Sequence, residues 1–307
     1  MNELVSVVIP THNRRESLSI AIDSVLKQSY KDIEIIVISD GSTDDTNEYM
    51  NQFVGDPKIV FLKNEKPMGA NYCRNMGIEA SKGNYIAFLD DDDEWYPDKI
   101  QSQISLLKDN DECAICFTGK ECFYYFDKAT ITYISSPSSS SDPTDILVGN
   151  YIGTNSSVLI KKVALVEEKY DLNLPALQDW DLWIRILKNN KSCYVNKPLV
   201  KYNTFLNSNT KTKHISSSVE KYKKAFALIE NKHLQEIKQL PFSKKRMRKR
   251  NMYSDIADRY MRNNMRMKAF LVMMKSCFTC FSLKDFLAAF VCFLNYRKVV
   301  KIKSLIS

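Results

Sequence analysis

The stretch YIAFLDDDDEW at residues 85–95 places four consecutive aspartates directly after an apolar segment that is typical of a buried strand. Neighbouring side chains of a strand point to opposite faces of the sheet, so a strand does not normally continue through such a run. At about 4 Å and an effective dielectric constant of about 20, each pair of carboxylates repels by about 4 kcal/mol. The run is therefore either a solvated acidic turn or a divalent-cation site, because Mg²⁺ and Mn²⁺ prefer hard oxygen ligands.

The residues before this stretch alternate between strand-like and helix-like patterns. Segments rich in Val and Ile at 4–9 and 33–38 indicate strands buried on both faces, and 58–62 indicates a third strand. After the first of them, Asn13 followed by Glu16 resembles a capping box that begins a helix. This alternation predicts an α/β domain with a mostly parallel central sheet that is flanked by helices.

Polar clusters follow three of the four expected strands, at residues 10–13, 39–42 and 90–93. Ligands of such sheets bind beyond the carboxyl ends of the strands, so we expect the three clusters to lie on one rim. Their convergence favours a binding site over an isolated acidic turn.

The second half of the chain differs from the first in charge and in pattern. The 307 residues carry a net charge of +8, and most of the excess lies beyond residue 185. Beyond about residue 215 the pattern becomes helical, with Met and Phe repeats. We therefore expect an α/β domain at 1–214 and a basic, α-helical C-terminal region at 215–307.

The basic run KKRMRKR at residues 244–250 has three interpretations. Such runs are usually solvated helix faces. Beside amphipathic helices the run also fits an anionic membrane surface, whereas no nucleic-acid-binding module accompanies it.

No apolar run reaches the roughly 18 residues of a membrane-spanning helix. The start of the chain lacks a secretory signal pattern, and the CxxC pairs at 113–116 and 277–280 are expected to be buried reduced thiols. A cytoplasmic protein, peripheral at the inner face of a bacterial membrane, is the expectation.

The order of the motifs closely resembles the family 2 glycosyltransferases of the GT-A fold. The resemblance covers roughly residues 4–205 and rests on VSVVIPTHNR, ISDGSTDDT, GANYCRN, GNYIAFLDDDDEW and QDWDLWIRI. It implies a Rossmann-like GT-A domain, a nucleotide-sugar donor, Mn²⁺ or Mg²⁺ as cofactor, and inversion at the anomeric carbon by a single displacement.

The resemblance also implies roles for individual residues. Asp92 of the family's Asp-x-Asp is the expected metal ligand, Asp179 the expected catalytic base, and Trp180 is expected to face an acceptor sugar. The residues that match nucleotide-sugar-binding positions are Thr11, Asn13, Asp40, Arg74, Asp90 and Asp91. Asp93 has no implied role.

Two departures from the family pattern affect these roles. Ser39 stands where many members have Asp, so the nucleoside role rests on the next residue, Asp40. Gln178 replaces the common Glu, which leaves Asp179 as the only carboxylate of that pair. A carboxylate there could also cap a helix, although Asp181 is the better candidate for that role. His214 is either a surface histidine or a further metal ligand.

The chain also lacks the Gln-x-x-Arg-Trp motif of processive synthases, so the resemblance implies transfer of one sugar. The expected reaction moves a hexose from a UDP-sugar, UDP-glucose or UDP-galactose, to a polyprenyl-diphosphate-linked saccharide in O-antigen biosynthesis. One alternative is a catalytically silent member of the family that acts as a membrane-associated assembly partner. A nucleotidyltransferase is a second alternative, but residues 10–14 do not form the glycine-rich loop that it needs.

Overall fold

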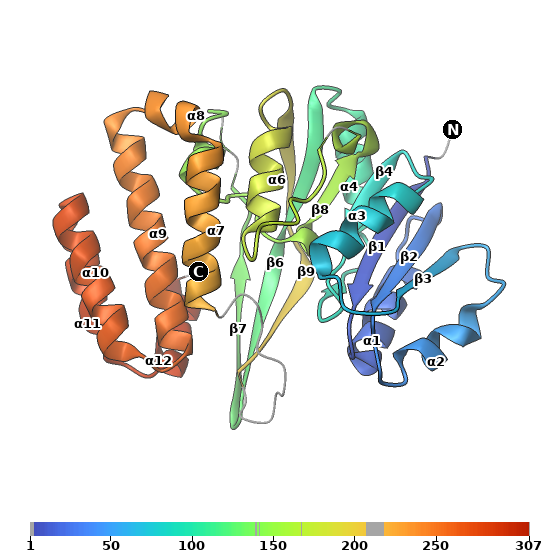
Figure 1. Ribbon diagram of the computed structural model, residues 1–307, viewed down its shortest axis with the longest axis horizontal. Helices are drawn as coiled ribbons and strands as arrows, with labels where there is room; N and C mark the ends of the chain where they lie inside the picture. Colours follow the sequence, from blue (N-terminus) through green and yellow to red (C-terminus); the bar gives the residue numbers. More distant parts are fainter. Residues whose placement is uncertain (1–2, 139, 141, 167, 207–217, 307) are drawn as a thin grey trace.

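The computed structural model describes residues 3–138, 140, 142–166, 168–206 and 218–306, and its centre is a mixed sheet with helices on both faces (Figure 1). His214 lies outside the described residues. The strands are β1 Val5–Thr11, β2 Ile33–Asp40, β3 Ile59–Asn64, β4 Tyr85–Phe88, β5 Glu94–Trp95, β6 Cys113–Phe126, β7 Ala129–Ser135, β8 Val158–Lys161 and β9 Lys191–Phe205. The helices that precede residue 206 are α1 Arg15–Leu26, α2 Thr46–Met50, α3 Ala70–Ala80, α4 Lys99–Lys108, α5 Asp145–Val148 and α6 Gln178–Ile186, with 3₁₀ turns η1 Asn51–Phe53, η2 Asn155–Ser157 and η3 Lys162–Leu165.

The sheet has the order β3-β2-β1-β4-β8-β6-β9-β5, and β7 pairs with β6. Strands β3, β2, β1 and β4 are parallel, as the alternation predicts, whereas β8 runs antiparallel to both β4 and β6. The carboxyl ends of β1, β2 and β4 meet at one edge. The three polar clusters therefore lie on one rim, which confirms that prediction.

Alternating side chains of the parallel strands build a core on each face of the sheet. In β1, Val7 and Ile9 belong to the core that contains α1 and α4, whereas Val8 belongs to the core that contains α3 and α6. Gly77 permits the close approach of α3, because a Cβ there would lie 2.3 Å from a methyl carbon of Val8. Burial on both faces explains why these strands are almost continuously apolar.

Two local predictions near β1 are wrong. The first strand, expected at residues 4–9, continues through Pro10 to Thr11. Proline is tolerated there because β4 pairs with β1 only as far as Val8, so no hydrogen bond from the proline nitrogen to β4 is needed. Asn13 does not cap α1: it has a left-handed backbone (φ 54°), and its Oδ1 accepts from the backbone N–H of Thr43 at 2.7 Å. The side chain joins two loops instead of starting a helix.

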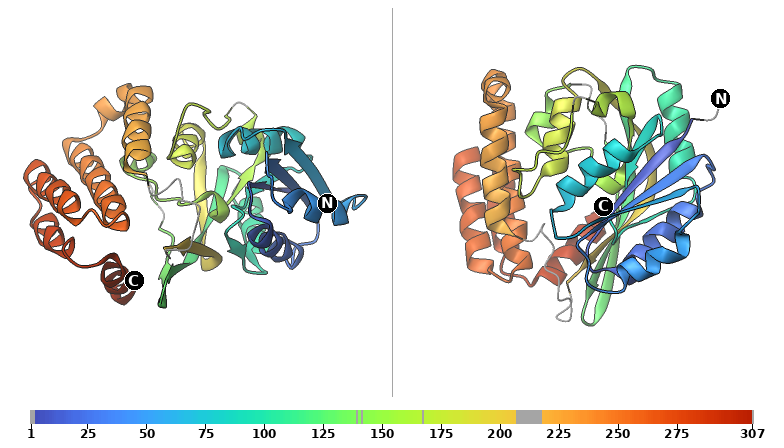
Figure 2. Two further views of the ribbon diagram at one scale, coloured as in Figure 1. Left: turned by 60° about the horizontal axis from the view of Figure 1, so that its bottom comes forward. Right: turned by 45° about the vertical axis from the view of Figure 1, so that its right-hand side comes forward.

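The C-terminal region is helical, as predicted, and it lies beside α6 (Figures 1 and 2). Its buried side chains Tyr222, Phe226 and Ile256 belong to the same core as Trp180 and Trp183 of α6. This shared core ties the helical region to the sheet domain. The helices are α7 Val219–Lys232, α8 Leu234–Gln239, α9 Phe242–Arg262, α10 Arg266–Cys280, α11 Leu283–Val291 and α12 Tyr296–Ile306.

Asp181 connects α6 to α7 and does not cap α6, contrary to the prediction. Its side chain is fully buried and accepts from Arg185 Nε at 2.9 Å and Lys232 Nζ at 3.0 Å, with His233 Nε2 at 3.4 Å. Burial acts to raise the Asp181 pKa, but His233, Arg185 and Lys232 lower it by more than burial raises it, and the resulting pKa is about 2. A buried carboxylate with three basic neighbours stays charged and fixes the two helices together.

Much of the basic run at 244–250 serves internal contacts. Lys244 pairs with Asp142 and Asp145, and Arg250 Nε lies 2.7 Å from an oxygen of Asp285. Arg248 is only 2% exposed, and burial lowers its pKa to about 10. The run is thus neither a plain solvated face nor a free cationic patch, because tertiary packing uses its charges.

The cysteines of both CxxC pairs are free thiols, and three of these four are buried. None of the helices in the described part of the chain is both long and apolar enough to cross a bilayer.

Candidate active site

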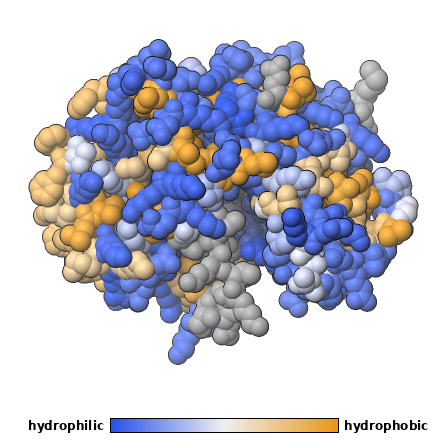
Figure 3. Space-filling model, viewed as in Figure 1, coloured by the Kyte–Doolittle hydropathy of each residue, from blue (hydrophilic) through white to orange (hydrophobic). Residues whose placement is uncertain are grey.

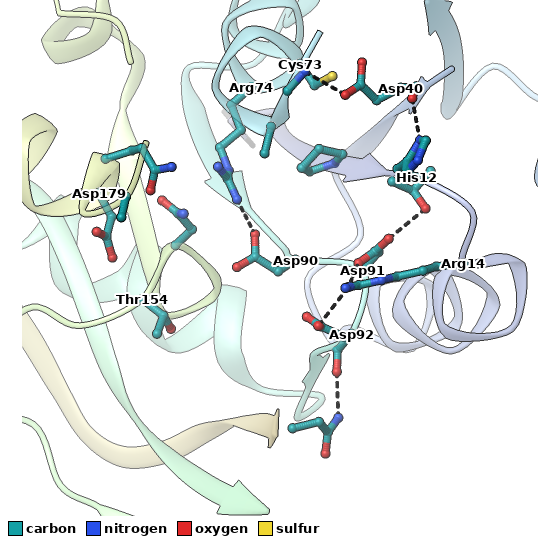
Figure 4. A pocket seen from close by; sticks show the side chains of 18 of the residues that line it. His12, Arg14, Asp40, Cys73, Arg74, Asp90, Asp91, Asp92, Thr154 and Asp179 are labelled. Carbon is teal, nitrogen blue, oxygen red and sulfur yellow. Dashed lines mark hydrogen bonds and ion pairs between the residues drawn. The ribbon is translucent and has the colours of Figure 1, made fainter. Parts of the chain in front are cut away.

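A pocket of about 550 Å³ opens at the rim where β1, β2 and β4 end (Figure 4). One wall comes from residues 10–12, 14 and 40 and from five residues between 67 and 74, and the floor from Asp90 to Asp92. Asp179 lies across the pocket from Asp40 and His12, with Asp90 between them (Figure 4). The pocket thus combines segments that are far apart in the sequence.

The acidic run divides into three carboxylates that line the pocket and one that does not. Asp90, Asp91 and Asp92 line it, whereas Asp93 is 1% exposed and points into the protein. Asp93 accepts from the Ser156 hydroxyl at 2.6 Å and from a backbone N–H of β9 at 3.2 Å. Burial and the charges of Asp92 and Asp90 raise the Asp93 pKa well above its usual range. This residue anchors the run to η2 and β9.

Arg14 holds two of the lining carboxylates together, and sequence reasoning gave it no role. Its Nη1 lies 2.8 Å from Asp91 Oδ1 and 2.9 Å from Asp92 Oδ2 (Figure 4). Asp91 also accepts from the Thr11 hydroxyl at 2.8 Å. Burial raises the Asp91 pKa to about 6, with Arg14 opposing and Asp92 adding to the rise. The only available signal was an arginine placed directly after the first strand.

Arg74 lies in the pocket wall, where the family resemblance implied it, and reaches the acidic run. Its Nη2 donates to Asp90 Oδ1 at 2.6 Å, and its guanidinium carbon is 5.5 Å from the centre of the Tyr170 ring. The Arg74 Nε is buried and has no hydrogen-bond partner. Burial is the largest single effect and lowers the Arg74 pKa, but the charges of Asp90 and Tyr170 and the hydrogen bond to Asp90 together outweigh it, so the pKa is raised overall.

Asp40 lines the same wall, and its carboxylate organises the loop that precedes α3. It accepts at 2.8 Å from Asn64 Nδ2 and from the backbone N–H groups of Met68 and Gly69. Burial raises the Asp40 pKa, but these donors outweigh it and the pKa is lowered. The next residue, Gly41, has a φ of 66°, and a Cβ there would lie 2.7 Å from the loop backbone.

The other residues with predicted nucleotide roles divide between the pocket and its support. Thr11 lines the pocket but gives its hydroxyl hydrogen to Asp91. Asn13 is not among the lining residues and supports the neighbouring loop. His12 lines the pocket, with its Nδ1 2.6 Å from the backbone oxygen of Asp40. Direct contact of Thr11, Asn13 and Asp40 with a nucleotide stays a prediction.

Asp179 stands at the start of α6, on the wall opposite the nucleotide side (Figure 4). Asn150 Nδ2 donates to its Oδ2 at 3.4 Å, and its Oδ1 accepts from the backbone N–H of Trp180 at 2.8 Å. Burial raises the Asp179 pKa to about 6, with this backbone N–H and Arg74 opposing. The raised pKa suits the role of a base, because a carboxylate with a raised pKa accepts a proton more readily near neutral pH.

Trp180 does not lie where its predicted role requires. It is 4% exposed, is absent from the pocket wall, and donates from its indole nitrogen to the Ile146 carbonyl at 2.6 Å. The guanidinium of Arg248 lies 5.0 Å from its ring centre. The hydrophobic contacts with the C-terminal helices bury the face that was expected to meet an acceptor, so that prediction is wrong as to position.

The lining carboxylates fit a cation that needs few protein ligands. No cluster of three or more His, Cys, Asp or Glu side chains in the described part of the chain is arranged to hold a metal ion by itself. Mg²⁺ and similar ions commonly take one or two carboxylates and complete their shell with phosphate oxygens and water. Asp92 and Asp91, on one side of an open pocket, supply such a partial set of oxygen donors.

A further wall of the pocket, which we call the far wall, consists of residues that were not predicted from the sequence. It contains Tyr202, Asn203 and Thr204 of β9 together with Arg259 of α9. No sequence signal placed Arg259 there, because the contact depends on how the C-terminal helices pack.

Comparison with known proteins finds glycosyltransferases, both by family model and among individual relatives. Residues 6–166 match the family model described as glycosyl transferase family 2. The chain is 32% identical over 210 residues to TuaG of Bacillus subtilis, to which a role in teichuronic acid biosynthesis is provisionally assigned, and the match covers 67% of this chain and 81% of TuaG. It is 34% identical over 190 residues to the Escherichia coli UDP-Glc:alpha-D-GlcNAc-diphosphoundecaprenol beta-1,3-glucosyltransferase WfaP, covering 60% of this chain and 70% of WfaP.

Solved structures share the fold at low sequence identity. The Pyrobaculum calidifontis mannosyltransferase PcManGT, in complex with GDP-Man and Mn²⁺, has a TM-score of 0.61 at 13% identity, covering 98% of this chain and 84% of that one. Residues 1–349 of Staphylococcus aureus TarS with UDP-GlcNAc give 0.56 at 13% identity, covering 90% and 89%. The fold is the GT-A fold, and the chain belongs to glycosyl transferase family 2.

Proposed function

We propose that this glycosyltransferase moves one hexose from a UDP-sugar to a saccharide carried on a polyprenyl diphosphate, with inversion at the anomeric carbon. The observation that carries the proposal is the position of Asp179 across one pocket from the acidic run (Figure 4). A donor on the nucleotide wall would then present its anomeric carbon toward the side from which an acceptor hydroxyl approaches.

In this mechanism the acceptor oxygen attacks the anomeric carbon while the bond to the UDP oxygen breaks, and its electron pair leaves with UDP. Asp179 takes the proton of the attacking hydroxyl as that hydroxyl becomes acidic in the transition state. Asp92 would hold Mn²⁺ or Mg²⁺, and such an ion neutralises charge on the leaving diphosphate. Arg74 and Arg14 keep Asp90 to Asp92 on the pocket side, so the charge is in place before the reaction.

The substrate classes follow the relatives' names. WfaP and a second E. coli relative, WfgD, are named for transfer of glucose from UDP-Glc to diphosphoundecaprenol-linked GlcNAc, and WfgD is 31% identical over 193 residues. These names support UDP-glucose as donor and an O-antigen or related surface polysaccharide as product, with UDP-galactose as the alternative donor. The absence of Gln-x-x-Arg-Trp supports single transfer.

The direct test is a panel of UDP-sugars against a synthetic lipid-diphosphate GlcNAc, with MnCl₂ or MgCl₂ and with EDTA. We expect one UDP-hexose to give a single-sugar product, and EDTA to reduce the rate by about 10²-fold or more because charge on the diphosphate is left uncompensated. Undiminished transfer in EDTA would contradict the metal requirement.

Hydrolysis of each UDP-sugar without acceptor separates an enzyme from a catalytically silent assembly partner. An active member releases UDP slowly in a metal-dependent way, whereas a silent member releases none.

We also propose that the protein attaches to an anionic membrane through an apolar surface of α10 and α11, defined by Phe278, Phe281, Leu283 and Leu287. These side chains are 62–80% exposed. Apolar side chains gather over these helices at the left edge of Figure 3. Residues 266–307 contain eight Lys and Arg and one acidic residue, Asp285, which already pairs with Arg250. Apolar exposure within a basic region suits an anionic lipid surface.

Substitution of this surface should weaken binding to vesicles. Phe281→Ser with Leu283→Ser removes roughly 1.5–3 kcal/mol of apolar burial per side chain, so we expect at least a tenfold smaller fraction to sediment with phosphatidylglycerol vesicles. Val54→Ser, at an apolar side chain that is 79% exposed outside this region, is the matched control. Equal sedimentation of the double variant and the control would refute this surface.

A further inference from the structure

Arg259 differs from the other two arginines of the pocket in that it forms no direct ion pair with a carboxylate of the described residues. Arg14 and Arg74 each form ion pairs with the acidic run. Arg259 also lines the pocket, but none of the described carboxylates lies within 4.0 Å of its guanidinium nitrogens. Its Nη1 donates to the Asp255 carbonyl at 2.9 Å, and its Nε is buried without a partner. The charge of Asp255 acts on Arg259 only without direct contact. A cation in a pocket wall that has no directly paired carboxylate is suited to an anionic ligand.

The position of Arg259 is fixed by packing. Its guanidinium carbon lies 3.8 Å from the centre of the Tyr222 ring, which is itself 1% exposed. Stacking of the planar guanidinium on an aromatic face leaves its edge available for hydrogen bonds. The residue therefore presents its charge with little freedom to move.

Other unpaired polar groups lie on the same wall. Thr204 lines the pocket and is 5% exposed, and its hydroxyl has no hydrogen-bond partner among the residues that the structure describes. Lys120 lies behind the wall, with its Nζ 4.6 Å from the centre of the Tyr202 ring. A buried hydroxyl without a partner is costly, so a ligand that supplies one would stabilise this wall.

This wall belongs to the same pocket as Asp179 and adjoins the acidic run, because Asn203 Nδ2 donates to the Asp92 carbonyl at 2.8 Å. The wall with the predicted nucleotide residues is built from residues 10–12, 14 and 40 and from the segment before and within α3, whereas the far wall is built from β9 and α9. Lys120 Nζ is 4.0 Å from the Cβ position that a side chain at Gly153 would have. Gly153 belongs to the turn in which Asn150 contacts Asp179. Lys120 thus lies near the turn that contacts Asp179, and Arg259 lines the same pocket.

We infer that Arg259, with Thr204 and with Lys120 behind it, binds the diphosphate of the acceptor. The inference rests on the proposed function in one respect, that the acceptor carries a lipid diphosphate. An arginine can engage two phosphate oxygens with parallel hydrogen bonds. The C-terminal helices then complete the active site through α9, in addition to contributing a surface.

Equilibrium binding of geranyl diphosphate tests this site without depending on turnover. The full chain is saturated with UDP and MgCl₂, which fills the donor phosphate position, and is then titrated with geranyl diphosphate or with geraniol. We expect the diphosphate to bind at least tenfold more tightly than the alcohol. Arg259→Ala should weaken diphosphate binding at least tenfold, and Arg259→Lys should weaken it less because the charge remains.

Lys249→Ala is the matched control, since it removes an exposed cation of the same helix away from the pocket. Thr204→Val provides an independent variant, for which we expect about threefold weaker binding through loss of one hydrogen bond. Circular dichroism and thermal melting establish that each variant is folded.

Three outcomes overturn the inference: unchanged diphosphate binding in folded Arg259→Ala, equal binding of geraniol, or an equal loss of UDP affinity in this variant. The last would assign Arg259 to the donor. Failure of the wild-type protein to transfer any sugar in the donor panel, with diphosphate binding intact, would instead overturn the proposed function.

Discussion

Replacing Asp179 with Asn should lower kcat by about 10³-fold while leaving the KM for the donor within about threefold, because a general base contributes roughly 10²–10⁴ in rate. Asn keeps the size of the side chain and an oxygen for the Trp180 N–H, so the fold of α6 should persist. The measurement is the initial rate of sugar transfer at saturating donor. Asp109→Asn, at an exposed carboxylate at the end of α4, is the control and should retain full activity.

The same residue predicts the acidic side of the pH profile. Burial raises the Asp179 pKa to about 6, so the basic form is lost as the pH falls through this value. At saturating donor, kcat should fall about tenfold per pH unit below that point. Asp91 also has a pKa of about 6, and its protonation should act on donor binding instead. A kcat that stays flat down to pH 5 would contradict Asp179 as the base.

Replacing Asp92 with Asn should lower the transfer rate by about 10²-fold or more, because a charged ligand of the diphosphate-bound cation is lost. Arg14 retains Asp91 as an ion-pair partner in this variant, so the pocket should remain folded. Electron paramagnetic resonance of Mn²⁺ with UDP gives a second readout that does not depend on turnover. Mn²⁺ should bind at least tenfold more weakly to the variant.

Asp98→Asn is the matched control for this substitution. Asp98 is an exposed aspartate just beyond the acidic run, and its side chain does not cap α4. It should bind Mn²⁺ and transfer sugar like the wild-type protein. If Asp92→Asn behaves in the same way as this control, Asp92 is not the metal ligand.

The fold class and the edge of the sheet that carries the pocket are readable from the sequence alone. Strands that are buried on both faces must be almost continuously apolar, and β1, β2 and β4 are readable for that reason. Parallel strands then bring the residues that follow them to one edge. Thr11, Asp40, Arg74, Asp90 to Asp92 and Asp179 all line one pocket, and the roles that the family resemblance implies for them stay predictions.

Local patterns were less informative where a tertiary contact competes with them. Asn13 and Glu16 read as a helix cap, but the loop at Thr43 offers Asn13 backbone donors that a chain pattern cannot reveal. Asp181 read as a cap for α6, but Lys232 and His233 approach it from α7. In both places a partner distant in sequence satisfies the side chain, so spacing alone gave the wrong role.

Only the tertiary structure decided how the four aspartates differ and what completes the pocket. Asp90 to Asp92 line the pocket beside Arg74 and Arg14, whereas Asp93 is bound by Ser156 and β9. Packing of α9 against α7 brings Arg259 to the far wall and buries Trp180 and Arg248 instead of exposing them. The physical reason is that burial and charge pairing depend on neighbours in space, and for these residues the neighbours lie far away in the chain.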